Sequence, residues 1–104
     1  MSDNVQHPKH YEGHTSLECI ECMELIFGTD YTAMFCLENA FKYLWRHENK
    51  NAEEDVDKAG WYLNWVDHKR DLLKDDNEDL PLEVVEKIPL LRSLYKKAKA
   101  RYSA

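Results

Sequence analysis

A strip of cationic and aromatic residues runs through positions 38–65 of the chain. Residues three or four apart in a helix are neighbours on one face. That spacing relates Asn39 to Tyr43, an amide and a phenol. It also relates Lys42 to Arg46, and a second set at the same spacing follows at Lys58, Trp61, Tyr62 and Trp65. Such a surface could bind phosphate through its cations and stack a nucleotide base on a ring, a contact worth about 1 to 3 kcal/mol.

More polar groups gather near the start of the chain, where four side chains can donate a hydrogen bond to phosphate or, as imidazoles, bind a metal: His7, His10, Tyr11 and His14. Cys19 and Cys22 are spaced as a zinc-binding pair, with His10 and His14 nearby. A zinc site normally needs a second spaced pair, which this sequence lacks. We therefore prefer buried helix cysteines and expect no bound zinc.

Other features limit the chemistry. The only glycines are Gly13, Gly28 and Gly60, so the Gly-rich phosphate loop of common nucleotide kinases is absent. A structural alternative also exists, in which Lys42 and Arg46 are surface charges paired with Glu38 and Asp55. In that alternative the aromatic rings lie in the core or in an interface. On composition alone this alternative is favoured.

The fold class expected from the hydrophobic periodicity is all-α, a small bundle of four to five helices in one domain of residues 1–104. We expect an irregular arm at 1–15, core helices at 16–73, an acidic loop at 74–81 and C-terminal helices at 82–104. The first helix should start at Ser16 and end at Gly28. A tight helical hairpin should follow the central helix, with Asn49 or Asn51 as the N-cap of its second arm. Gly60, in mid-helix, indicates the close approach of a neighbouring backbone.

Four stripes of apolar residues should face the core. In the first helix the stripe is Leu17, Ile20, Met23 or Glu24, and Phe27. In the central helix it is Met34, Leu37, Phe41 and Leu44, and His47 or Glu48 could extend it. In the next helix it is Val56, Ala59, Leu63 and Val66. In the last helix it is Leu91, Leu94, Tyr95 and Ala98. The basic residues between 92 and 101 should pair with the acidic segment 67–86, within or between subunits.

Length and charge exclude several classes of function. At 104 residues and a net charge of -6, the protein is not expected to bind duplex nucleic acid, whose affinity depends on neutralising phosphates. No apolar run approaches the roughly 20 residues of a membrane span, and nothing resembles a secretory signal, so we expect a cytoplasmic protein with no membrane partner. Three cysteines favour free thiols over disulfides. Three tryptophans and six tyrosines are many for this length, which favours a homo-oligomer.

Four ordered segments resemble a known family: HPKHY at 7–11, LEC at 17–19, FCLENAFKYLWR at 35–46 and EEDVDKAGWYL at 53–63. They are similar to small bacteriophage proteins labelled either as a domain of unknown function or as a phage nucleotide kinase. The resemblance covers residues 5 to about 66. The matching positions are His7, His10, Tyr11, Asn39, Lys42, Tyr43, Arg46, Asp55, Lys58 and Trp61. One departure is Glu38, where the family usually has glycine.

The resemblance implies a deoxynucleoside monophosphate kinase without a phosphate loop, acting in an infected bacterial host. In that interpretation Lys42, Arg46 and Lys58 neutralise the phosphoryl group being transferred. Mg²⁺ would be held by Asp55 with Glu54 or Glu38. His10 would orient or deprotonate the acceptor, and Tyr62 joins the ligand-binding set as a stacking ring. We place the site at a subunit interface, because the N-terminal arm is long enough to reach another chain.

Two other functions remain open from the sequence. A protein that sequesters a signalling nucleotide of the host immune system needs the cations and rings but no metal or base. An inhibitor of a host protein would act through its acidic surface, although a charge run is usually only a solvated face.

Overall fold

The computed structural model describes the backbone of residues 16–103 and the side chains of residues 19–103. This part of the chain is all α-helical and contains no strand, as the sequence predicts. Its elements are α2 (Ser16–Phe27), α3 (Thr29–Arg46), the short 3₁₀ helix η2 (His47–Asn49), α4 (Glu53–Asp75), α5 (Leu82–Val85) and α6 (Ile88–Arg101). They fall into two units, Met1–Thr32 and Ala33–Ala104. The predicted arm at 1–15 lies outside the described residues.

In the first unit, α2 ends where the sequence predicts, because Gly28 takes a φ of 91° that residues with a side chain rarely adopt. The N–H of Gly28 donates to the Glu24 carbonyl at 2.8 Å, and the hydroxyl of Thr29 donates to the Glu24 carboxylate at 2.7 Å. The rings of Phe27 and Tyr31 stack across the turn, with centroids 5.3 Å apart. This short link leads directly into α3.

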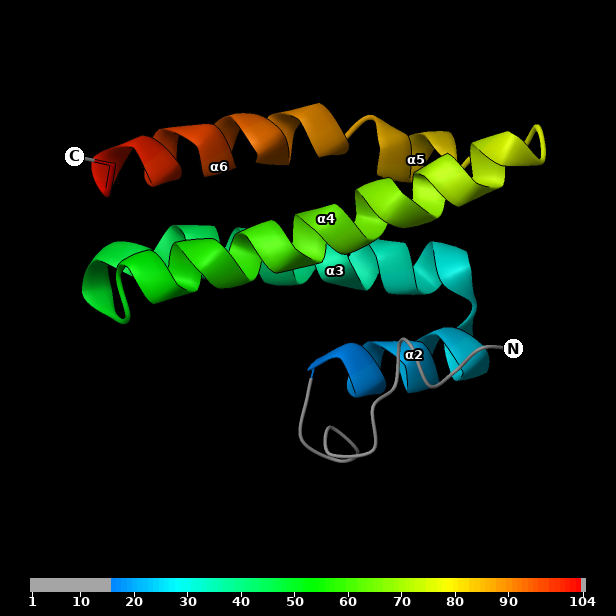
Figure 1. Cartoon of the computed structure of the whole chain (residues 1–104), viewed down its shortest axis with the longest axis horizontal. Coiled ribbons are helices and arrows are strands. Elements are labelled where there is room, and N and C mark those ends of the chain that lie inside the picture. The colour runs from blue at the N-terminus through cyan, green and yellow to red at the C-terminus, as the bar shows by residue number, and fades with distance from the viewer. Residues whose placement is uncertain (1–15, 104) are drawn as a thin grey trace. The chain divides into compact units, whose positions relative to one another are not determined.

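The second unit contains the hairpin of α3 and α4, with α6 running back alongside α4 (Figure 1). The stripe predicted for α4 is confirmed, since Val56, Ala59, Leu63 and Val66 are all buried. Further buried residues come from α3 and α6: Cys36, Leu37, Ala40, Leu44, Ile88, Leu91 and Ala98. Alanines at several inward positions leave room for close helix packing.

The predicted stripes are wrong at three aromatic or aliphatic positions, and the first is Phe27 at the end of α2, which is 56% exposed. Phe41 is 47% exposed and Leu94 is 42% exposed. The inward face of α3 is formed by Leu37, Ala40 and Leu44, and Phe41 lies at the border of this face. Periodicity assigns a residue to a side of a helix, but the width of the covered side depends on how many neighbouring helices are present.

Gly60 does allow a close approach, but the neighbour is a side chain and not the predicted backbone. A β-carbon built at Gly60 would lie 2.7 Å from the hydroxyl oxygen of Tyr95, in α6, and 2.9 Å from its ring. Tyr95 therefore occupies the space that any larger residue at position 60 would need.

Ion pairs line the contact between α4 and α6, and these confirm that the basic tail helix pairs within the chain. Lys99 meets Asp57 at 3.3 Å. Arg92 pairs with Asp67, and Arg101 pairs with Glu48 at the end of the hairpin. The acidic partners thus lie mainly before residue 67 and not in the predicted segment 67–86.

The acidic loop predicted at 74–81 begins two residues later, because α4 continues to Asp75. Asn77 has a φ of 62°, and the N–H of Glu78 donates to the Leu73 carbonyl at 2.8 Å, which closes the helix end. Nε and Nη2 of Arg70 donate hydrogen bonds to the two carboxylate oxygens of Asp79, at 2.8 and 3.1 Å. Among the residues described, no helix is long and apolar enough to cross a membrane.

Candidate functional site

The turn between α3 and α4 is fastened by one buried carboxylate, that of Asp55. The side chain is fully buried, and its two oxygens accept hydrogen bonds from Nε and Nη2 of Arg46, both at 3.3 Å. A third donor is the backbone N–H of Asn51, at 3.2 Å. Asp55 is the third residue of α4, so this contact resembles the backward reach of a capping box.

The N-cap prediction at Asn49 or Asn51 is wrong. The N-cap is Ala52, which makes no side-chain hydrogen bond, and Asn51 contributes its backbone N–H instead. The signal for this arrangement was present in the sequence as an acidic residue at the third helical position. The structural alternative paired Arg46 with Asp55 as surface charges, whereas in the structure the Asp55 carboxylate of this pair is fully buried.

The charge state of Asp55 follows from its partners. Burial by itself raises the pKa of this carboxyl, but the hydrogen bonds from Arg46 and Asn51 and the positive charge of Arg46 outweigh it. The net result is a pKa below the ordinary aspartate value. Asp55 is therefore ionised at neutral pH and fixes the guanidinium of Arg46 at the mouth of the turn.

Three cations converge on the ring of Tyr43. Its centroid lies 4.8 Å from Cζ of Arg46, 4.9 Å from Nζ of Lys42 and 5.6 Å from Nζ of Lys58. Each distance is within the range of a cation–π contact. Tyr43 also stacks on Tyr62, with centroids 6.0 Å apart, and the edge of Trp61 meets Tyr62 at 5.1 Å. We refer to Lys42, Tyr43, Arg46, Lys58, Trp61 and Tyr62 as the Tyr43 cluster.

The cluster carries more positive charge than it neutralises internally. Arg46 is paired with Asp55, whereas within the described chain neither Lys42 nor Lys58 makes an ion pair. Glu38 and Glu54 each lie one turn before a lysine, but both are exposed and neither pairs with it in this part of the structure. The structural alternative is therefore half right: Arg46 forms an ion pair with Asp55, but Lys42 forms none with Glu38. Two uncompensated lysines make this surface attractive to an anion.

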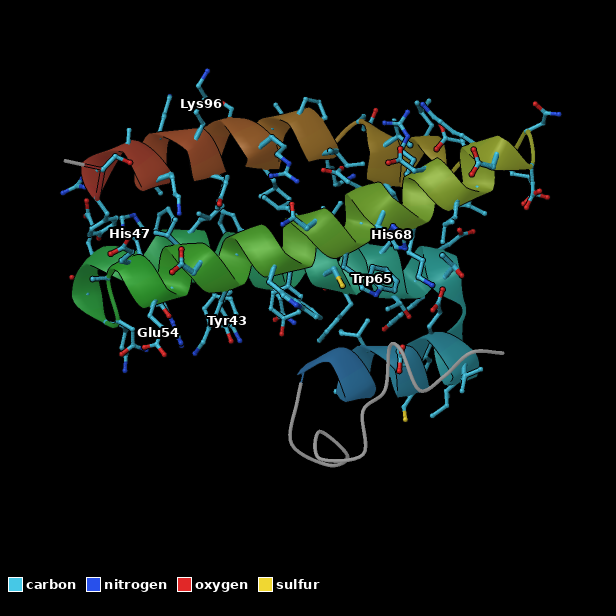
Figure 2. The ribbon with its side chains drawn as sticks, in the orientation of Figure 1. Tyr43, His47, Glu54, Trp65, His68 and Lys96 are labelled. Carbon is cyan, nitrogen blue, oxygen red and sulfur yellow. The ribbon has the colours of Figure 1, made fainter. Side chains whose placement is uncertain are left out.

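The rings of the cluster differ in what they offer a ligand. Tyr62 is only 9% exposed and supports Tyr43 from within. Tyr43 is half-buried between its cations and Tyr62, while Trp61 is 36% exposed. Trp61 is thus the ring of the cluster with the most surface for stacking. Figure 2 shows Tyr43 on the side of the hairpin away from α6, and His47 on the side that faces α6.

The structure brings together seven of the residues expected in the site: Lys42, Tyr43, Arg46, Asp55, Lys58, Trp61 and Tyr62. Asn39 is half-buried one turn before Tyr43 in α3. His7, His10 and Tyr11 lie outside the described residues. His47, one of the two residues that could extend the α3 stripe, is buried. Sequence reasoning missed its contact with Tyr102, whose hydroxyl oxygen lies 2.7 Å from Nδ1 of His47.

The described residues do not fit a bound Mg²⁺ at Asp55. Both of its oxygens are held by protein donors, and the carboxylate has no exposed surface. Across residues 16–103, no group of three histidine, cysteine or acidic side chains is arranged to hold a metal. Cys19 and Cys22 are exposed free thiols and not the buried cysteines expected, whereas Cys36 is buried.

The fold and this site define a small helical-hairpin protein with a cationic and aromatic surface at the hairpin end. The chain belongs to DUF3310, a family described as proteins of unknown function, whose model matches residues 5–64. The matched range contains the whole Tyr43 cluster and ends within α4. Searches of curated proteins and of solved structures found no match.

Proposed function

We propose that this protein binds a phosphorylated nucleotide at the Tyr43 cluster. The observation that carries the proposal is the convergence of Lys42, Arg46 and Lys58 on one ring, where among the described residues only Asp55 forms an ion pair with one of them. Like charges gathered this closely repel one another, so an anion placed between them is stabilised by all three. A phosphate group has the charge and the acceptor oxygens to fill that role.

The residues of the Tyr43 cluster would make different contacts with the nucleotide. Lys42 and Lys58 would neutralise phosphate charge, because no acidic partner within the described residues competes for them. Arg46 is held in place by Asp55 through Nε and Nη2, which leaves Nη1 available for a phosphate oxygen. Trp61 would stack on the base, a contact typically worth about 1 to 3 kcal/mol.

Sequestration of an intact nucleotide is the activity that the described residues support best, because it needs only cations and a stacking ring. A deoxynucleoside monophosphate kinase is the second proposal, and it is supported by the resemblance of the four ordered segments between residues 7 and 63. Phosphoryl transfer also requires metal ligands and a group that orients the acceptor, and among the residues described here no group of three histidine, cysteine or acidic side chains is arranged to hold a metal. His10 stays a candidate for the acceptor role.

A thermal-shift screen against nucleoside mono-, di- and triphosphates and cyclic oligonucleotides tests binding. A ligand at 100 times its dissociation constant stabilises a protein by about 2.7 kcal/mol, which is easily measured in a domain of this size. We expect Lys42→Ala and Lys58→Ala to abolish the shift. Lys96→Ala, which removes an exposed lysine on α6, is the matched control and should keep it. Absence of a shift with every nucleotide refutes the proposal.

Chromatography of the recovered ligand separates the two activities. After incubation with Mg²⁺ and a triphosphate donor, an unchanged nucleotide indicates sequestration. Conversion of a monophosphate to a diphosphate, lost in Lys42→Ala, establishes the kinase.

A further inference from the structure

Two residues that the sequence pattern assigns to the core, Phe41 and Leu94, are instead exposed and line one groove. The groove lies between α3 and α6 and has a volume of about 270 Å³. Leu44 and Ala98, both buried, form part of its lining, and Trp45 and Lys97 border it. An apolar surface where the helical pattern predicts burial indicates that a packing partner is missing.

The apolar surface extends beyond the groove itself. Trp45 is 77% exposed, and its ring stacks on that of Phe41 with centroids 5.9 Å apart. On α6, Leu90 is 67% exposed, one turn before Leu94. We refer to the surface formed by Glu38, Phe41, Trp45, Leu90, Leu94 and Lys97 as the α3–α6 face. It presents two aromatic and two aliphatic side chains.

The spacing of these residues matches that of a helix-packing seam. In α3 they are separated by three and then four residues, and in α6 by four and then three. Alternating steps of three and four keep side chains on one side of a helix and are typical of helices that pack along their length. The face is therefore suited to helices from another chain.

Charge is distributed unevenly along the face. α3 and α6 run in the same direction (Figure 1), and Phe41 and Leu94 line the same groove. At a rise of about 1.5 Å per residue, Glu38 lies about 4.5 Å before Phe41 and Lys97 about 4.5 Å after Leu94. Both charged residues are exposed, and neither makes an ion pair with the part of the chain that is described. One end of the face is acidic, the other is basic and the middle is apolar.

We propose that the α3–α6 face binds the same face of a second copy of this chain, with the helices of the two copies antiparallel. A two-fold axis that crosses the helices sets α3 against the partner's α3 and α6 against the partner's α6. Along the helix direction Glu38 is then level with the partner's Lys97 on the neighbouring helix, and Trp45 is level with the partner's Leu90. Phe41 and Leu94 then bury their exposed surfaces at the centre. A parallel arrangement would instead bring the two acidic ends together. A surface that is complementary to itself under a two-fold rotation favours a second copy over an unrelated helix.

The proposed interface is separate from the proposed nucleotide site. Tyr43 lies on the side of the hairpin away from α6, so its cluster stays accessible when the α3–α6 face is covered (Figure 2). Glu38 and Trp45 lie one turn from Lys42 along α3, so Leu94→Glu, on α6, is the variant that tests the interface apart from the nucleotide site.

Light scattering of the full chain during size-exclusion chromatography tests the interface. We expect wild type to have at least the mass of a dimer, and Trp45→Glu and Leu94→Glu to be monomers with unchanged helical circular dichroism. Leu82→Glu is the matched control, because Leu82 is 76% exposed but lies outside the face, and it should keep the wild-type mass. A monomeric wild type, or wild-type mass in both face variants, overturns the proposal.

Charge reversal tests the antiparallel arrangement. Glu38→Lys and Lys97→Glu should each raise the dimer dissociation constant by about tenfold, since each brings like charges together twice in a symmetric interface. The double variant restores opposite charges and should recover most of the wild-type affinity. A double variant weaker than either single variant rules out this pairing.

Discussion

Asp55 and Asp57 lie two residues apart in α4, yet they hold their neighbours in very different ways. The Asp55 carboxylate is fully buried and accepts three hydrogen bonds, two of them from Arg46. The Asp57 side chain is 60% exposed and meets a single lysine, Lys99, at 3.3 Å. The first fastens the α3–α4 hairpin, and the second belongs to the ion pairs between α4 and α6.

The difference leads us to expect that burial and donor number, not the presence of an ion pair alone, decide how much stability is lost when one partner is removed. A buried carboxylate that loses a partner is left uncompensated in a medium of low polarity, whereas an exposed one is rehydrated. The hairpin end that carries the Tyr43 cluster should therefore be rigid. The contact of α4 with α6 should depend instead on apolar packing, including the packing of Tyr95 against Gly60.

The largest effect should come from Asp55→Asn. The amide cannot balance the charge of Arg46 and donates where the carboxylate accepted. We expect a loss of about 2 kcal/mol in the free energy of unfolding, less than the roughly 3 to 5 kcal/mol of a fully buried pair because Arg46 can be rehydrated. Urea denaturation measures this loss. Asp57→Asn is the matched control and should leave the unfolding midpoint almost unchanged; equal losses in the two variants would contradict the comparison.

Low pH should remove the contribution that the Asp55 carboxylate makes to the free energy of unfolding. The pKa of Asp55 is lower in the folded protein than the ordinary aspartate value of about 3.9 expected on unfolding. Its stabilising contribution is therefore complete above the unfolded pKa and is lost as the pH falls through the folded pKa. Denaturation of wild type and Asp55→Asn over a pH series should give a constant difference in the free energy of unfolding near neutral pH. That difference should shrink below about pH 4, and a difference that persists into strong acid would show that charge is not its source.

The packing of α6 against α4 can be tested with Gly60→Ala. The added methyl group would lie 2.7 to 3.0 Å from the outer end of the Tyr95 side chain, which must shift to admit it. We expect overpacking of about 1 to 3 kcal/mol, offset by a gain of about 1 kcal/mol in helix propensity, to leave a net loss near 1 kcal/mol. Thermal unfolding measures it. Combining Gly60→Ala with Tyr95→Leu should cost less than the sum of the two single changes; strict additivity would indicate that the two residues do not touch.

The smallest expected effect concerns the turn that precedes Asp55. Ala52 has a φ of 52° and a ψ of -121°, a conformation that favours glycine. Ala52→Gly should relieve this strain and stabilise the hairpin by about 0.5 to 1 kcal/mol, after allowance for the greater freedom of glycine in the unfolded chain. Chemical denaturation of the variant checks the sign. Ala100→Gly, in the helical backbone of α6, should be destabilising and serves as the control.

Three features could be predicted from the amino-acid sequence: the helical class, the end of α2 at Gly28 and the buried stripe of α4. These depend on local properties, namely the periodicity of apolar residues and the conformational freedom of glycine. Residues 42–62 were also recognisable as a cationic and aromatic strip, since helical spacing alone makes such residues neighbours.

Other features depend on how the helices pack against one another. That Arg46 pairs with Asp55 while Lys42 and Lys58 turn to Tyr43 depends on how two helices meet across the turn, which no spacing within one helix encodes. The exposure of Phe41 and Leu94 likewise depends on which sides of α3 and α6 have a neighbour. Periodicity marks a side chain as suited to burial, but only the packing of other helices against it, from this chain or another, removes it from water.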